Sequence, residues 1–157
     1  MAILFLLGPS LWESGEDVPM RTRREIGKVF RESGHRVILM EDQADKEDED
    51  LVEKFYRLLL EKRVTDIVVY WPAHAKMQTT YDEFILLRAR MDISKLPRIW
   101  VLHHSSVASI KVGQFEVKER GGRSRYLTAV AKLGTHPLEW DSAEDLKEQV
   151  RLLAMEL

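Results

Sequence analysis

Glu83 is the residue whose type and position are best suited to chemistry in this sequence. It falls in the first turn of a predicted helix that follows a β-branched run, so it would lie above the open edge of a parallel sheet. A carboxylate there can attack the anomeric carbon of a sugar or stabilise an oxocarbenium-like centre. A structural role is the alternative, because Thr80 and Glu83 have capping-box spacing, in which Glu83 would bond the backbone amide of Thr80.

Two aromatic residues lie near Glu83 in the sequence and could contact a flat ligand. Trp71 follows the β-branched run, and Tyr81 lies in the same helical turn as Glu83. Both could stack on a nucleobase or a sugar ring, although aromatic residues at strand and helix ends more often pack in a core or at its rim. Asp82, adjacent to Glu83, is a further candidate for substrate binding.

Three histidines follow two neighbouring predicted strands and could converge on one edge of the sheet. His74 follows the first of these strands, and His103 and His104 follow the second. Three imidazoles would suit zinc, but no ligand spacing supports a metal site, and we expect none. A neutral imidazole could instead polarise a leaving group, so His74 and His104 are candidates for contacts with the substrate.

Gly8, Pro9 and Ser10 follow the first apolar run and precede a long loop. A glycine there lets a ligand approach the backbone, and the Ser10 hydroxyl adds a donor; a plain strand-ending turn is the equal alternative. The loop lacks both the P-loop pattern and the G-x-G-x-x-G dinucleotide fingerprint, and we expect no cofactor. Tyr70-Trp71 stands where a phosphoacceptor receiver domain has an aspartate, which disfavours that class.

The charged segments around these candidates are most simply solvated surface. The acidic segment 41–50 would bring negative charge to the positive end of a helix. An earlier helix carries a basic face that we expect to be exposed, made of Arg21, Arg24, Lys28 and Arg31. A phosphate held by Arg21 or Arg23, near the start of that helix, is the less favoured interpretation.

The composition is typical of one globular domain without a basic field. The chain has 157 residues, of which 45% are apolar, and a formal charge of −2. These values predict a single domain over 1–157 and argue against nucleic acid as a partner. No apolar run approaches the roughly 20 residues that span a bilayer. The opening run at 2–7 lacks the basic segment of a signal peptide, so we expect a cytoplasmic protein.

Cysteine and asparagine are both absent from the chain, and 32% of the residues are charged. The absence of cysteine excludes disulfides, thiolate metal sites and cysteine nucleophiles. Few thermolabile side chains together with abundant Glu, Lys and Arg are typical of thermophiles, which favours the hypothesis of a hot source.

The elements that must position these candidates alternate between short apolar runs and segments of helical period, as in βαβ units. We predict strands at 2–7, 36–40, 66–70, 98–103 and 138–140. We predict helices over 19–33, from about 50, from about 80, over 124–134 and from 142. Ser142 and Asp145 have capping-box spacing at the start of the last helix. The segment 110–118 could be an extra extended arm between strands four and five.

The fold class follows from the apolar character of these strands. Strands this apolar are covered on both faces, which favours a parallel sheet. Right-handed crossovers then predict a three-layer, doubly wound α/β fold with the flavodoxin-like strand order 2-1-3-4-5. In such sheets ligands bind beyond the carboxyl ends of the strands, here at 8–10, 41–42, 71–74 and 103–106.

Several motifs, in this order, resemble the nucleoside 2-deoxyribosyltransferase family, which includes deoxynucleotide N-glycosidases and is similar in fold to Toll/interleukin-receptor-like domains. The motifs are Leu6-Leu7-Gly8-Pro9, Ser33-Gly34-His35-Arg36-Val37, Thr65-Asp66-Ile67-Val68-Val69 and the downstream Glu83. The resemblance implies that Glu83 acts on C1 of the sugar and that Gly8 and Pro9 line the pocket. It also implies that Asp66 matches the family's aspartate at strand three, and that the chain forms homo-oligomers.

Three functions are open at this point. The favoured one is cleavage or transfer of the N-glycosidic bond of a small-molecule nucleoside, nucleotide or NAD-like compound by Glu83. The alternative is a non-catalytic nucleotide-binding or signalling module, favoured by the segment 75–80, which is bulkier than the family's glycine-containing approach to the glutamate. The third is an assembly domain whose arm at 112–117 pairs with another chain.

Overall fold

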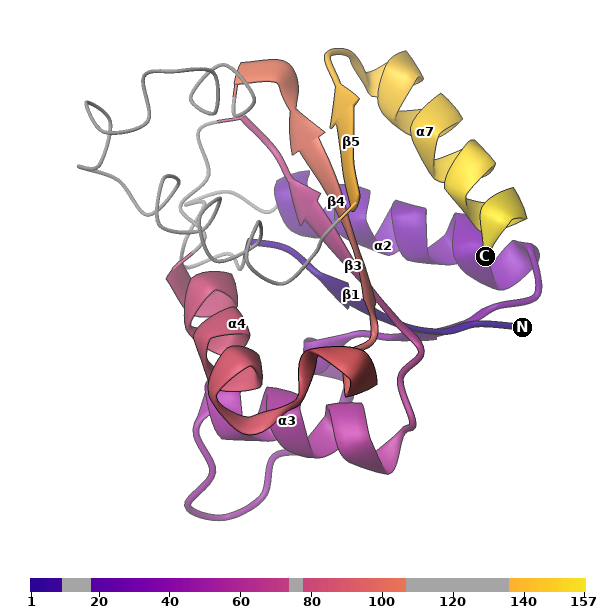
Figure 1. The fold of residues 1–157 in the computed structure, drawn as a ribbon. Coiled ribbons are helices and arrows are strands. Elements are labelled where there is room, and N and C mark those ends of the chain that lie inside the picture. Colours follow the sequence, from indigo (N-terminus) through magenta and orange to yellow (C-terminus); the bar gives the residue numbers. More distant parts are fainter. Residues whose placement is uncertain (10–17, 74–77, 107–135) are drawn as a thin grey trace.

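A five-stranded parallel sheet forms the centre of the protein (Figure 1). The computed structural model describes residues 1–9, 18–73, 78–106 and 136–157. The strand order is β2-β1-β3-β4-β5, and each neighbouring pair is parallel. The strands are β1 (Ile3–Leu7), β2 (Arg36–Ile38), β3 (Asp66–Trp71), β4 (Arg98–His104) and β5 (His136–Trp140). The predicted fold class and strand order are confirmed.

Helices cover both faces of the sheet and complete the three layers (Figure 1). One face carries α2 (Val18–Glu32) and α7 (Ala143–Glu156), and the other carries α3 (Leu51–Glu61) and α4 (Gln78–Arg90). Alternate side chains of β1 divide between these layers. Leu4 and Leu6 pack into the cluster that contains α2 and α7, whereas Phe5 and Leu7 pack into the cluster with α3 and α4. Burial on both faces explains why β1 is apolar throughout.

Polar caps set two of the helix starts where the sequence predicts them. The Asp50 carboxylate accepts a hydrogen bond from the backbone amide of Glu53 at 2.8 Å, so α3 begins at Leu51. Ser142 accepts from the amide of Asp145 at 3.1 Å and caps α7. The Asp145 carboxylate accepts from the amide of Asp141 at 3.1 Å, so the second hydrogen bond of the predicted capping box is made to the residue before Ser142.

Two predicted boundaries need correction. β2 ends at Ile38 rather than at 40, because the chain turns into a short 3₁₀ helix, η1 (Met40–Asp42), whose carboxylates pair with arginines of α2. α4 begins at Gln78, so Thr80 lies inside the helix and cannot be its N-cap. The capping-box interpretation of Thr80 and Glu83 is therefore wrong. Both side chains are buried.

The remaining expectations concern the second half of the chain. β3 and β4 each run one residue further than predicted, and β5 starts at His136 rather than at 138. A second 3₁₀ helix, η2 (Ile93–Lys95), precedes β4. The predicted arm at 110–118 and the helix at 124–134 lie outside the described residues. Within the part of the chain that the structure describes, no helix is both long and apolar enough to cross a membrane.

Candidate functional site

A cavity of about 310 Å³ lies at the carboxyl ends of β1 and β2, next to the starts of α2, α3 and α4. This is the edge of the sheet at which doubly wound folds bind their ligands. The apolar part of the wall is made of Leu7, Met20, Met40 and Leu51. The charged part is made of Arg23, Glu41, Asp45, Lys54 and Glu83.

Three of these charged side chains are almost completely buried. Arg23 and Lys54 are each 4% exposed, and Glu83 is 3% exposed. Each lies near the start of its helix, on the stripe that packs toward the sheet; in α4, for example, Phe84 and Leu87 belong to the same stripe. Burying a charge is unfavourable unless it is paired, so the contacts of these residues account for much of the site.

Arg23 is held by a carboxylate from another element. Its Nη2 donates to Oε1 of Glu41 at 2.8 Å. Its Nε is buried and has no hydrogen-bond partner among the described residues. Burial lowers the pKa of Arg23, and the negative charges of Glu41 and Glu83 oppose that shift. The guanidinium therefore interacts electrostatically with two carboxylates that line the same cavity.

Gly8 permits this position of Arg23. A Cβ atom placed on Gly8 would lie 2.9 Å from Cδ of Arg23 and 3.3 Å from the carbonyl oxygen of Tyr70. The glycine of the strand-ending turn is thus needed for close approach of a protein side chain. The sequence predicted that a ligand would approach Gly8 closely, whereas in the structure the side chain of Arg23 does so.

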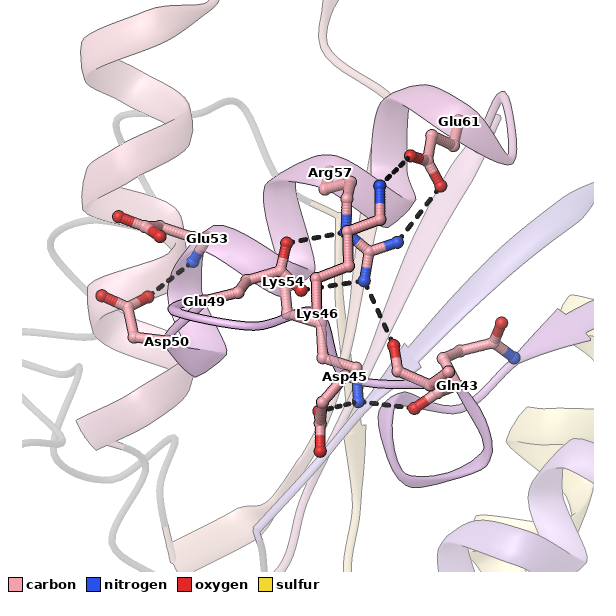
Figure 2. A network of polar contacts seen from close by, with 10 residues as sticks. Gln43, Asp45, Lys46, Glu49, Asp50, Glu53, Lys54, Arg57 and Glu61 are labelled. Carbon is pink, nitrogen blue, oxygen red and sulfur yellow. Dashed lines mark hydrogen bonds and ion pairs between the residues drawn. The ribbon is translucent and has the colours of Figure 1, made fainter.

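Lys54 connects α3 to the acidic segment in front of it. Its Nζ donates to the backbone carbonyl of Gln43 and to Oδ1 of Asp45, both at 2.7 Å (Figure 2). Both acceptors line the cavity. The buried cation is therefore satisfied, and it fixes this part of the wall.

Hydrogen bonds and ion pairs hold several residues of the acidic segment 41–50. Arg57 donates to both carboxylate oxygens of Glu49, at 2.7 and 2.8 Å, and to the carbonyl of Ala44 at 3.2 Å (Figure 2). Glu41 pairs with Arg23, and Asp42 pairs with Arg24. The segment is mostly exposed and Asp50 caps α3, as the sequence predicts, and its carboxylates are in addition paired with cations on α2 and α3.

The structure brings two of the predicted site residues together, since Glu83 and Gly8 both line the cavity. Pro9 is buried but is not part of the wall. Ser10 and His74 lie outside the described residues, and so does the side chain of Tyr81.

The other predicted contacts lie away from the cavity. Trp71 is completely buried in the core cluster with Phe84. Asp82 is exposed on α4 and is not part of the wall. His104 is at the end of β4, where its ring meets the Trp140 ring edge-on at 4.8 Å. Trp71 therefore packs in the core, which was the alternative to stacking on a ligand.

Asp66 lies at the opposite end of the sheet from the cavity. It is fully buried at the start of β3, where Nε1 of Trp100 donates to it at 3.0 Å and Nε of Arg98 lies 2.8 Å away. Thr65 donates to its other oxygen at 2.7 Å. These contacts join β3 to β4, so this aspartate has a structural role in the described part of the chain.

Sequence reasoning missed Lys54 as a site residue and considered Arg23 only as a weak phosphate ligand. A signal was present in the helical period, because both residues fall in otherwise apolar, sheet-facing stripes near a helix start. Glu41 was marked by its position after β2 but not carried further. Among the residues described, no cluster of three or more His, Asp or Glu side chains could hold a metal ion.

Comparison with known proteins identifies the fold and no family. No family model and no curated protein matches this chain. A solved structure described as a conserved protein from Enterococcus faecalis V583 superimposes with a TM-score of 0.53 at 12% sequence identity. The match covers 98% of this chain and 99% of that one. The similarity extends over the whole domain and supports the α/β architecture.

Proposed function

We propose that this protein cleaves or transfers the N-glycosidic bond of a nucleoside, nucleotide or NAD-like compound, with Glu83 acting on C1 of the sugar. The observation that carries the proposal is the position of Glu83. Its side chain is 3% exposed, and it lines a cavity of about 310 Å³ at the carboxyl edge of the sheet. A pocket of roughly 300 Å³ or more is in the range used for small-molecule ligands.

A buried carboxylate such as that of Glu83 suits a reaction that develops positive charge on the sugar. As the bond between C1 and the base nitrogen breaks, its electron pair leaves with the base, and C1 becomes oxocarbenium-like. A carboxylate of Glu83 would either bond to C1 or stabilise this charge. Water or an acceptor base would then bond to C1 in place of the Glu83 carboxylate, and the proton that this nucleophile loses would be taken up by the departing base. In a water-poor site such electrostatic stabilisation is stronger than in bulk solvent.

The test is release of free base from a panel of nucleosides, deoxynucleotides and NAD, followed by chromatography. We expect turnover of at least one compound by the unaltered protein. Glu83→Ala and Glu83→Gln should lower kcat by several orders of magnitude while circular dichroism stays unchanged. Glu144→Gln is the matched control, because Glu144 is an exposed carboxylate in the first turn of α7, outside the cavity.

The outcomes separate the two candidate functions. Turnover retained in Glu83→Gln would exclude the catalytic role. Binding of a nucleotide by calorimetry, with no base released by the unaltered protein, would select the non-catalytic binding module instead.

A further inference from the structure

Arg23 is a buried cation with few hydrogen-bond acceptors around it in the described part of the chain. A guanidinium carries five N–H donors. Nη2 of Arg23 donates to Oε1 of Glu41 at 2.8 Å, and the buried Nε has no acceptor among the described residues. The residue is only 4% exposed. Buried donors without an acceptor are uncommon in proteins, so the Nε–H of Arg23 indicates a place where a ligand atom accepts.

This guanidinium lies at the cavity. Arg23, Glu41 and Gly8 all line the wall. A Cβ atom placed on Gly8 would lie 3.6 Å from Nε of Arg23, so this donor is next to the part of the wall that has no side chain. An oxygen atom of a ligand bound against Gly8 would therefore lie beside the guanidinium.

Glu41 places an acceptor beside these donors. Its Oε1 makes both of its ion-pair contacts, at 2.8 Å from Nη2 of Arg23 and 3.7 Å from Nη2 of Arg24. Its Oε2 has no partner among the described residues, and the side chain is 24% exposed. The wall thus offers donors and an acceptor side by side. A hydroxyl group matches both, because its oxygen accepts while its O–H donates.

The charges of the wall favour an uncharged ligand. The described residues that line the cavity contribute three carboxylates and two cations. The cation of Arg23 is paired with Glu41, and Nζ of Lys54 lies 2.7 Å from Oδ1 of Asp45. Neither cation is therefore left to neutralise an anion, and a phosphate group would lie against carboxylates, which is unfavourable.

We propose that Arg23 and Glu41 bind a sugar hydroxyl of an uncharged nucleoside: the guanidinium donates to the hydroxyl oxygen, and the hydroxyl donates to Oε2 of Glu41. That the sugar belongs to a nucleoside rests on the proposed function, which requires C1 to lie at Glu83 in the same cavity. Recognition of the hydroxyl does not depend on bond cleavage, and binding alone measures it.

The experiment measures affinities by calorimetry for the common ribonucleosides and 2′-deoxyribonucleosides, for their 5′-monophosphates, and for analogues that each lack one sugar hydroxyl. We expect nucleosides to bind more tightly than their 5′-monophosphates. Removing the hydroxyl that contacts the pair should weaken binding about 10-fold or more, because the donor and the carboxylate are left unpaired. If base release is detected, all affinities are measured in the Glu83→Gln background.

A double-mutant cycle tests whether this hydroxyl contacts Glu41. Glu41→Gln replaces the second acceptor oxygen by an amide group, so the effect of removing the hydroxyl should fall to about 3-fold or less. Asp42→Asn is the matched control, because Asp42 is the next residue of η1, pairs with Arg24, is exposed and does not line the cavity. It should leave the hydroxyl effect unchanged. If Glu41→Gln does not fold, Arg23→Lys provides the comparison, because lysine keeps the charge without the planar fork.

Three results would each overturn the proposal: no nucleoside binds, a 5′-monophosphate binds more tightly than its nucleoside, or every hydroxyl effect is the same in Glu41→Gln and in the unaltered protein. Failure of the proposed function has a different signature. In that case nucleosides bind with a hydroxyl effect that depends on Glu41, but no base is released. Conversely, base release with hydroxyl effects independent of Glu41 would retain the proposed function and exclude this site.

Discussion

At the scale of single residues, the distinguishing feature is a group of three buried charges at one edge of the core, at the opposite end of the sheet from the buried Asp66. Arg23, Lys54 and Glu83 occupy helix positions where an aliphatic side chain would bury more favourably. Lys54 is matched by Asp45, and Arg23 is matched by Glu41. This arrangement costs stability that a purely structural domain would not need to give up, so it is the main argument for a functional cavity.

The close contact of Gly8 with Arg23 gives a prediction at this scale. Gly8→Ala places a methyl group 2.9 Å from Cδ of Arg23 and should force the guanidinium to move. We expect a loss of about 1–3 kcal/mol in the free energy of unfolding, as for other overpacked sites, together with reduced turnover. Urea unfolding and the base-release assay measure the two effects.

Gly27→Ala is the control for Gly8→Ala. A Cβ atom at Gly27 would lie 3.5 Å from the nearest atoms of Leu6 and Val37, which is ordinary contact. Because Gly27 is inside α2, alanine there should be neutral or stabilise by up to about 1 kcal/mol. If Gly8→Ala and the unaltered protein had equal stability and turnover, the claim that Arg23 requires a glycine at this turn would be contradicted.

At the scale of elements, the acidic segment and α3 form one electrostatic unit (Figure 2). Arg57 bonds Glu49 in the segment and Glu61 one turn further along α3. The hydrogen bond from Arg57 lowers the pKa of Glu49, and the hydrogen bond from Lys46 is the main cause of the lowered pKa of Glu61. Ionisation of these two carboxylates therefore stabilises the folded state.

This unit should make stability depend on pH in the acid range. A carboxyl group with a lowered pKa in the folded state stabilises above its unfolded pKa, near 4.3 for Glu, and the contribution is lost as the pH falls through the folded value. We expect the unaltered protein to lose more stability than Arg57→Gln between pH 6 and the acid side of roughly pH 4. Urea unfolding at several pH values measures this difference. Arg31→Gln, at an exposed position on α2, should behave like the unaltered protein, and identical pH slopes in all three would contradict the prediction.

At the scale of the whole molecule, His35 links the two ends of the chain. Its Nδ1 accepts a hydrogen bond from the backbone amide of Ala2 at 3.1 Å, so its Nε2 carries the proton and donates to the carbonyl of Ala154 at 2.8 Å. Ala2 precedes β1, and Ala154 is in the last turn of α7. Both chain ends lie on the same side of the molecule (Figure 1).

Replacement of His35 should therefore weaken the fold without affecting the cavity. His35→Ala leaves an amide and a carbonyl from two other elements without their partner, and we expect a loss of about 1–3 kcal/mol in unfolding free energy. Thermal unfolding measures the loss, and base release should be unchanged, because this link lies at the opposite end of β1 from Gly8. Unchanged stability, or a loss of turnover in the folded variant, would contradict this assignment.

Local signals in the sequence were sufficient to predict the architecture and two residues that line the cavity, Gly8 and Glu83. Apolar runs bounded by caps and glycines predicted every described strand within two residues of its end, because backbone hydrogen bonding and the burial of alternate side chains act over a few residues. The parallel order followed from strands that are apolar on both faces. Gly8 was found because it directly follows β1, and Glu83 because it lies in the helix after β3, and the carboxyl ends of these strands meet at one edge.

Only the tertiary structure decided which charges meet. Arg23, Glu41 and Lys54 come from three different elements, and no local period indicates that the first pairs with the second while the third bonds to Asp45. The same holds for Trp71, whose ring could have reached a ligand or the core and is buried with Phe84. Such choices depend on the free energy of pairing or burying side chains from separate elements, which is defined only after those elements have packed.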